Sequence, residues 1–337
     1  MTEHLLRNPL SGLNTRRRFL QSVGGAATSI LVSESARSRL SNISSPIRLG
    51  MITDLHQDTM HDGPERLGKF LKEMKKEPPD AIIQLGDFAV PSKENQTLTD
   101  SFNHAHPVAM HVLGNHDADG GYSYDQTLEA WGMKERYYYR DIGGLRVIVL
   151  DGNEKPPNHI SGYPSHIGLT QMTWLQTTLQ SHDGPILVLS HQPLAGPWAV
   201  DNADDIQNVL NTAADRVLLA VNGHSHIDHL VRKGNIGYLH LNSASYVWVG
   251  RRYRRQTYSP EVHAAYPKLA SACPYREPLF TTLTIDPVNG RIDLKGCDSQ
   301  WVGESPAERG RDKHPNLIDG EQIVPRIRAR QIRRIAT

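Results

Sequence analysis

Short apolar runs, each followed by a polar turn, recur through the middle of the chain. Five of these runs have the composition of buried strands: residues 47–53, 81–85, 110–113, 186–190 and 217–222. Runs of this length bounded by turns favour strands, because helices need more residues to bury a face. The pattern therefore predicts a sheet whose strands carry their polar residues at one end.

Between these runs, apolar side chains recur at helical spacing. Leu67, Phe70, Leu71 and Met74 share one face of a predicted helix over residues 64–74. Four further helices are predicted: residues 95–104, residues 125–131 with Asp125 as the cap, residues 170–179 with Thr170 as the cap, and residues 206–213. Alternation of strands with helices implies parallel strands whose polar turns lie at one edge of the sheet.

Other segments predict antiparallel pairing. Residues 137–141 and 145–150 flank Gly143-Gly144, which is a hairpin signal. Further strands are predicted over residues 236–241, 279–285 and 292–294. A mixed sheet follows from this combination. The connection over residues 242–278 is long, so we expect it to be functional or to be partly ordered by its aromatic side chains.

Composition narrows the class of protein. The chain has 337 residues, 38% of them hydrophobic, with 37 basic and 36 acidic side chains. This balance gives no reason to expect a nucleic-acid partner or a stable membrane span. Cys273 and Cys297 are the two cysteines, which excludes a disulfide framework and a cysteine-rich zinc site. Whether these two form a single bridge remains open, because spacing does not fix their geometry.

The two ends of the chain differ from the middle. Arg16 and Arg17 precede a mildly apolar run over residues 22–32, the layout of a twin-arginine export signal. That interpretation predicts a partner in the twin-arginine export machinery and a location in the periplasm or outside the cell; the alternative is a basic N-terminus without a signal. We expect residues 1–46 to be signal and linker, 47–297 the folded domain, and 298–337 a polar, Arg-rich tail.

Acidic and histidine residues gather in the turns after the five strands. These turns are Asp54-Leu55-His56, Gly86-Asp87, Gly114-Asn115-His116-Asp117, His191 and Gly223-His224-Ser225-His226. Since the carboxyl ends of parallel strands meet at one edge, the turns are expected to form one site. A single histidine is more often a hydrogen-bonded structural residue, but carboxylate, imidazole and amide donors in five ordered turns indicate a site for divalent metals such as Mn, Fe or Zn.

Among the histidines outside these turns, five carry an expectation of their own. His61 and His229 lie beside acidic residues but do not fit the pattern, so we expect them around the site or on the surface. His104, His106 and His111 are expected to be structural.

The ordered series D-x-H, G-D, G-N-H-D, H and G-H-x-H resembles the calcineurin-like metallophosphoesterases, and its blocks span residues 54–226. The resemblance implies an α/β fold in which two mixed β-sheets pack as a sandwich flanked by helices. It also implies a dinuclear metal site in which Asp87 bridges two divalent cations. By the family's pattern, one cation would have the ligands Asp54, His56 and His226, and the other would have Asn115, His191 and His224.

The same resemblance assigns the catalytic roles. His116 would contact the scissile phosphate and protonate the leaving group, and we expect Asp117 to hydrogen-bond the other ring nitrogen. A water whose pKa is lowered by the two cations would be the nucleophile.

At some motif positions the sequence departs from particular branches of this family, and these departures narrow the kind of metal site that we expect. The first block is not the D-x-G of purple acid phosphatases, and Val90 stands where their iron-binding tyrosine would be. The series is more similar to the class III cyclic-nucleotide phosphodiesterase branch. Residues 251–255 read Arg-Arg-Tyr-Arg-Arg, which suits a grip on phosphate groups beyond the scissile one, although a solvated loop is the plainer interpretation.

These observations predict a metal-dependent hydrolase that acts on a phosphodiester or phosphomonoester of a small molecule. A nuclease or a phospholipid-directed phosphodiesterase is the alternative within the same reaction class. A binding module on a metallophosphoesterase scaffold is the non-enzymatic alternative. It is disfavoured because no ligand of the series is missing.

Overall fold

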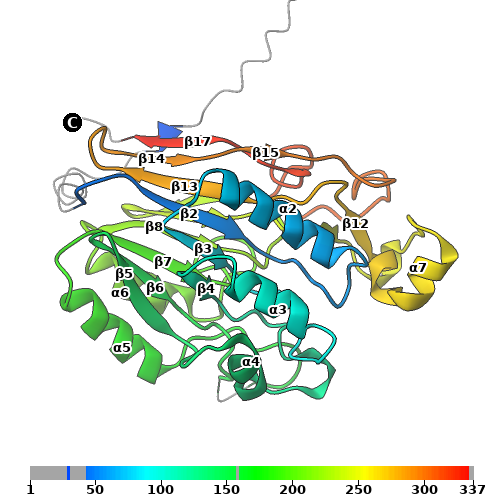
Figure 1. Cartoon of the computed structure of the whole chain (residues 1–337), viewed down its shortest axis with the longest axis horizontal. Coiled ribbons are helices and arrows are strands. Elements are labelled where there is room, and N and C mark those ends of the chain that lie inside the picture. Colours follow the sequence, from blue (N-terminus) through cyan, green and yellow to red (C-terminus); the bar gives the residue numbers. More distant parts are fainter. Residues whose placement is uncertain (1–28, 31–42, 157–158, 334–337) are drawn as a thin grey trace, which may run out of the picture.

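The structure is a computed structural model and describes residues 29–30, 43–156 and 159–333. Two β-sheets lie against each other, and helices cover their outer faces (Figure 1). This arrangement confirms the expected α/β class, with two mixed sheets packed as a sandwich.

The first sheet contains seven strands: β1 (Ser29–Ile30), β2 (Ile47–Ile52), β3 (Ala81–Gln84), β4 (Ala109–His111), β13 (Thr281–Asp286), β14 (Arg291–Leu294) and β17 (Arg330–Arg333). Their order across the sheet is β1-β17-β14-β13-β2-β3-β4. The strands β2, β3 and β4 are parallel, as their helical connections require, whereas β13 pairs antiparallel with β2. The polar turns after β2, β3 and β4 therefore share one edge.

The second sheet contains six strands: β5 (Tyr138–Ile142), β6 (Leu145–Val149), β7 (Ile186–Ser190), β8 (Val217–Asn222), β9 (His229–Lys233) and β10 (Ile236–His240). The hairpin predicted around Gly143-Gly144 is confirmed, since β5 and β6 pair antiparallel there. The strands β6, β7 and β8 are parallel. The edge strand β9 was not predicted, because its exposed positions are polar or charged and break the apolar alternation.

Alternation along each strand divides the apolar side chains between two cores. In β7, Leu187 and Leu189 join the core between the sheets, whereas Ile186 and Val188 face the helices of the second sheet. In β2, Leu49 and Met51 face the second sheet, while Ile52 packs under the helices on the other side. A sheet buried on both faces explains why these strands read as continuous apolar runs.

Helices cover both outer faces (Figure 1). The first sheet is covered by α2 (Gly63–Lys76), α3 (Gln96–Asn103) and α4 (Tyr124–Trp131), and the second by α5 (Leu169–Gln180) and α6 (Ala203–Asn211). Two predicted caps were wrong. Ser123 caps α4, because its hydroxyl accepts from the Gln126 amide and Gln126 reaches back to the Ser123 N–H. Helix α5 begins after Gly168, which places Thr170 inside its first turn.

The long connection after β10 is ordered. It contains β11 (Tyr246–Trp248), η2 (Arg251–Tyr253), α7 (Pro260–Ala265), η3 (Pro267–Ser271) and β12 (Ala272–Pro274). Aromatic packing contributes, because the His61 ring lies 4.4 Å from the Tyr258 ring and 6.4 Å from the Tyr266 ring. Figure 1 shows this segment, in yellow, projecting beyond the end of the sheets.

The C-terminal segment is not the tail that its composition predicts. Past residue 297, the chain adds β16 (Arg326–Ile327), which pairs with β15 (Cys297–Asp298), and β17, which pairs with β14. Arg328 and Arg330 form ion pairs of 3.0 Å and 2.5 Å with Asp228, which is fully buried. A buried carboxylate requires such partners, so these arginines belong to the fold.

The sequence also raised the questions of an export motif, a cysteine bridge and a membrane span. The twin-arginine motif lies outside the described residues. Cys273 and Cys297 are free thiols, so they do not form a bridge. Within the ranges that the structure describes, none of the helices combines the length and apolar composition of a membrane span.

His111, at the end of β4, is a structural histidine, as predicted. Its Nε2 lies 2.7 Å from Asn103 Oδ1 and its Nδ1 lies 3.0 Å from Gln84 Nε2. These partners assign the neutral tautomer with the proton on Nε2. Burial among the aromatic side chains of Phe102 and Trp131 lowers the pKa of His111 to about 3.

This burial predicts a pH-dependent stability. Below about pH 6.5, the unfolded chain binds a proton at His111 that the native protein does not, so the free energy of unfolding falls by up to about 1.4 kcal/mol per pH unit as the pH drops towards about 3. The variant His111→Gln should show a shallower slope by about this amount. Urea unfolding at several pH values measures both slopes, and equal slopes would contradict the assignment.

Candidate metal centre

Six of the seven predicted ligands form two groups where the ends of the two sheets meet, and the seventh, Asn115, is buried in the turn after β4. Asp54 and His56 follow β2, Asp87 follows β3 and Asn115 follows β4, while the remaining three follow strands of the second sheet: His191, His224 and His226. Carboxylate oxygens and imidazole nitrogens form two groups, each with its atoms within 4.8 Å of one another. The groups are Asp54, His56 and His226, and Asp87, His191 and His224.

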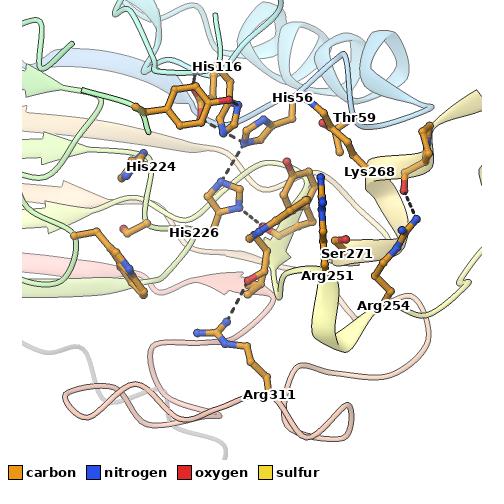
Figure 2. A pocket seen from close by; sticks show the side chains of 18 residues that line it. His56, Thr59, His116, His224, His226, Arg251, Arg254, Lys268, Ser271 and Arg311 are labelled. Atoms are coloured by element: carbon orange, nitrogen blue, oxygen red, sulfur yellow. Dashed lines mark hydrogen bonds and ion pairs between the residues drawn. The ribbon is translucent and has the colours of Figure 1, made fainter. Parts of the chain in front are cut away.

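In the first group, three donor atoms face a common point. His226 Nε2 lies 3.1 Å from Asp54 Oδ1. It also lies 3.1 Å from His56 Nε2 (Figure 2). The other nitrogen of His226, Nδ1, lies 2.7 Å from the Tyr246 carbonyl, so it carries the proton and leaves the Nε2 lone pair for a ligand. A shared cation is the arrangement that stabilises such facing donors.

In the second group, a backbone carbonyl likewise orients a histidine ring. His191 Nδ1 donates to the Leu85 carbonyl at 2.7 Å, which leaves His191 Nε2 to face Asp87 Oδ2 at 3.2 Å. Among the described residues, buried His191 Nε2 and buried Asn115 Oδ1 have no hydrogen-bond partner. Buried polar atoms rarely lack a hydrogen-bond partner, so these two atoms fit the role of ligands to a metal ion.

Asp87 borders both groups. Its Oδ2 lies 3.6 Å from His56 Nε2 and 3.2 Å from His191 Nε2, and its Oδ1 accepts from the His116 backbone N–H at 2.8 Å. A carboxylate placed between two cations offsets their mutual repulsion. The geometry therefore fits Asp87 as the shared ligand.

The charges of the site also fit cations. Burial alone would raise the pKa of Asp54, but His226 outweighs it and lowers that pKa to about 2; the pKa of Asp87 is lowered well below its usual value, chiefly by His191 acting against burial. Burial lowers the pKa of His56 to about 3 and that of His224 to about 4. Ionised carboxylates and neutral imidazoles are the forms that bind metal. His191 differs, because Asp87 outweighs burial and raises its pKa to about 9, so a cation bound there would displace the proton of His191.

The backbone is strained at the ligands. Six residues other than glycine have a positive φ in the described part of the chain, and five of them are candidate ligands: Asp54, His56, Asp87, His224 and His226. This conformation is unfavourable for such residues and persists where surrounding structure enforces it, commonly at functional sites. Gly86 and Gly114 permit the close approach, because a Cβ at Gly86 would lie 2.4 Å from His191 Nδ1 and one at Gly114 would lie 2.2 Å from the Asp87 amide nitrogen.

The prediction that Asp117 hydrogen-bonds the His116 ring was wrong. Asp117 accepts from the backbone N–H groups of Gly114, Asp87 and Phe88 at 2.7–2.9 Å, so it ties the turn after β3 to the turn after β4. The ring partner is Asp119, whose Oδ2 lies 2.9 Å from His116 Nδ1. The Asp119 backbone N–H donates to the His116 carbonyl at 3.1 Å, so a turn over residues 116–119 brings Asp119 back to the ring, while the side chain of Asp117 is buried.

Sequence reasoning also missed residues around His116. The Tyr163 hydroxyl donates to Asp119 Oδ1 at 2.7 Å, and Lys268 Nζ lies 3.4 Å from Asp119 Oδ2. Burial would lower the pKa of His116, but Asp87 and Asp119 outweigh it and raise that pKa above its usual value. The spacing of three residues between His116 and Asp119 was a usable signal, whereas Tyr163 and Lys268 come from distant loops and left none.

A cavity of about 740 Å³ opens over the metal ligands. Five residues of the candidate metal centre line it: His56, Asp87, His116, His224 and His226. Its walls add aromatic and basic side chains: Tyr163, Trp198, Tyr246, Trp248, Arg251, Arg254, Lys268 and Arg311. Such a volume suits a whole small molecule rather than a phosphate alone.

The sequence profile described as calcineurin-like phosphoesterase matches residues 47–228, more than half of the chain. The chain belongs to this family. It is accordingly a hydrolase that acts on phosphate esters, and its two ligand groups are candidate sites for the metal ions on which such phosphoesterases depend. No curated protein sequence matches the chain.

Solved structures agree with the fold. A dimetal phosphatase from Danio rerio is similar with a TM-score of 0.51 and 16% identity, covering 77% of this chain and 97% of its own. GAP50, the anchor in the inner membrane complex of Plasmodium, is similar with a TM-score of 0.51 and 14% identity, covering 77% of this chain and 86% of its own. At these identities the similarity concerns the fold of the phosphoesterase and not its substrate.

The two histidines that did not fit the sequence pattern lie outside both ligand groups. His61 packs against Tyr258, and the His229 ring lies 5.7 Å from that of His240.

If Asp87 is shared, its loss affects both cations of the phosphoesterase. Asp87→Asn should lose most of both metals, whereas His56→Ala and His191→Ala should each lower the occupancy of one site preferentially. Elemental analysis after dialysis measures the content per chain. Retention of two metals in Asp87→Asn would contradict the bridge.

Proposed function

We propose that this phosphoesterase is an exported enzyme that hydrolyses a phosphodiester or phosphomonoester of a small molecule at a dinuclear metal centre. The observation that carries the proposal is the shared position of Asp87 between two ligand groups, with the His116 ring beside them in one cavity.

The residues of the chain divide the chemistry between them. Two bound divalent cations would supply Lewis acidity and a water of lowered pKa as nucleophile. His116 lines the cavity next to the first ligand group, with its ring centroid 5.4 Å from that of His56. Asp119 binds Nδ1 and stabilises the protonated ring, which leaves the Nε2 proton for the departing oxygen. Tyr163 and Lys268 hold Asp119 in turn.

The donors suit Mn, Fe or Zn as the two ions. Val90 offers no phenolate, and so the proposal does not include a purple ferric site. A preference for diesters, as in the cyclic-nucleotide phosphodiesterase branch that the sequence resembles, is part of the proposal.

The cavity favours this proposal over its alternatives. A concave site of about 740 Å³ suits a small molecule better than a nucleic-acid strand or a membrane surface, which a nuclease or a phospholipid-directed enzyme would have to admit. A binding or anchoring role, like that of the Plasmodium anchor protein, does not require ligands for two cations.

Export rests on Arg16 and Arg17 before the apolar run of residues 22–32. We expect the twin-arginine machinery to carry the protein out of the cytoplasm. Replacing both arginines with lysine should retain it there, as cell fractionation measures, and unchanged export would overturn this part of the proposal.

The direct test of the reaction is turnover of bis(p-nitrophenyl) phosphate and p-nitrophenyl phosphate by protein loaded with Mn, Fe or Zn. Either ester should be hydrolysed in a metal-dependent manner, and a faster diester reaction would support the diester preference. If neither ester is hydrolysed with any of the three metals, the proposal is wrong.

The role of His116 has its own signature. His116→Ala should lower kcat by about 10²–10⁴ while metal content stays near that of the wild type. The variant should lose more kcat towards an alkyl ester than towards a nitrophenyl ester, because an alkoxide leaves poorly without a proton. Asp119→Asn should show the same dependence on leaving group with a smaller loss, and Asp125→Asn, an exposed carboxylate outside the cavity, is the matched control. Equal losses for both ester types would contradict the general acid.

A further inference from the structure

Three arginines line the cavity beside the metal ligands. They are Arg251, Arg254 and Arg311, here called the cavity arginines. Arg251 lies in the turn η2 and Arg254 follows it by three residues, which brings both side chains to one face of the turn. Figure 2 shows Arg251 and Arg254 on the yellow segment after β11, and Arg311 arriving from a separate loop of the C-terminal region.

The arginines next to these in sequence form ion pairs outside the cavity, whereas the cavity arginines do not. Arg252 forms an ion pair with Asp312 at 3.3 Å, and Arg255 forms one with Glu304 at 3.6 Å. Neither lines the cavity. For the cavity arginines, by contrast, the described part of the chain places no carboxylate within ion-pair distance. A plain solvated loop gives no reason for this division, whereas a cavity that receives an anion does.

Two of the cavity arginines are positioned by backbone carbonyls. Arg254 Nη2 donates to the Pro267 carbonyl at 3.1 Å, and Arg311 Nη1 donates to the Trp248 carbonyl at 3.5 Å (Figure 2). Each guanidinium has five N–H donors, so most remain for a ligand. The forked geometry of arginine suits phosphate oxygens in particular.

Two tryptophans provide an apolar surface in the same cavity. Trp198 and Trp248 both line it, and their side chains are 43% and 44% exposed. Trp198 also has a φ of 57°, a conformation that a bulky residue adopts only under local constraint. Exposed aromatic rings held in a cavity favour contact with a planar or apolar part of a ligand.

We propose that the substrate is a phosphate ester that carries a second phosphate group and a planar ring, as a phosphorylated nucleotide does. This inference rests on the proposed function. The metal centre holds the scissile phosphate, the cavity arginines bind the second phosphate, and Trp198 and Trp248 contact the ring between them. The cavity arginines thus determine specificity.

A pair of chromogenic diesters tests this directly. Thymidine 5′-(p-nitrophenyl phosphate) and its 3′-phosphorylated form have the same leaving group and differ by one phosphate. The wild type loaded with Mn should prefer the 3′-phosphorylated compound in kcat/KM by about tenfold or more, the usual effect of charge-assisted hydrogen bonds. This comparison depends on no variant and so cannot be lost to misfolding.

Variants then show whether the cavity arginines cause the preference for the 3′-phosphorylated ester. Arg251→Ala and Arg254→Ala should each shrink the ratio of the two kcat/KM values towards one. Arg252→Ala should keep the ratio of the wild type, because that neighbour is 78% exposed and paired with Asp312 outside the cavity.

The outcomes separate the two proposals. If the metal-loaded wild type hydrolyses neither this pair nor the simple nitrophenyl esters, the proposed function fails. If it hydrolyses both thymidine esters equally, the function stands and the inferred substrate class is wrong. A preference that survives in both cavity variants would overturn the role of these arginines.

Discussion

Two buried carboxylates at the meeting point of the sheets are the constraint on which the structure depends. Asp54 and Asp87 are almost completely buried and lie close to each other's ligand group, and two such charges are tolerated only with compensating cations. Two of the histidines around them, His191 and His226, are oriented by backbone carbonyls so that their Nε2 atoms point inward. Strained φ angles at five ligands are the backbone consequence of bringing these donors together.

The sandwich supplies what this constraint requires. Asp54, His56, Asp87 and Asn115 come from the first sheet, whereas the remaining ligands come from the second, so neither sheet holds a complete site. Metal binding and the packing of the two sheets are therefore coupled. The ligands follow directly after strands buried on both faces, which are the most rigid elements available, and this rigidity maintains geometry that loops alone would not.

Much of this arrangement could be predicted from the sequence, because buried strands and their polar turns are local features. The ends of helices were less predictable: Ser123 competes with Asp125 as a cap, and only the reciprocal bond with Gln126 decides between them. The strand β17 was missed because Arg330 reads as polar, although Asp228 neutralises it inside the fold. The three-residue spacing makes Asp119 a possible partner of the His116 ring, but only the path of the turn decides between Asp117 and Asp119.

The division between sheets and loops also separates reaction from specificity. The metal ligands and His116 follow strands, where small displacements are resisted, while the cavity arginines come from the segment after β11 and from the loop that contains Arg311. Ion pairs such as Arg252–Asp312 connect these two loops on the outer side, and among the described residues no carboxylate pairs with their inner arginines. Substitutions on the inner side can therefore change which substrate is bound while the metal centre, fixed by the strands, keeps its geometry.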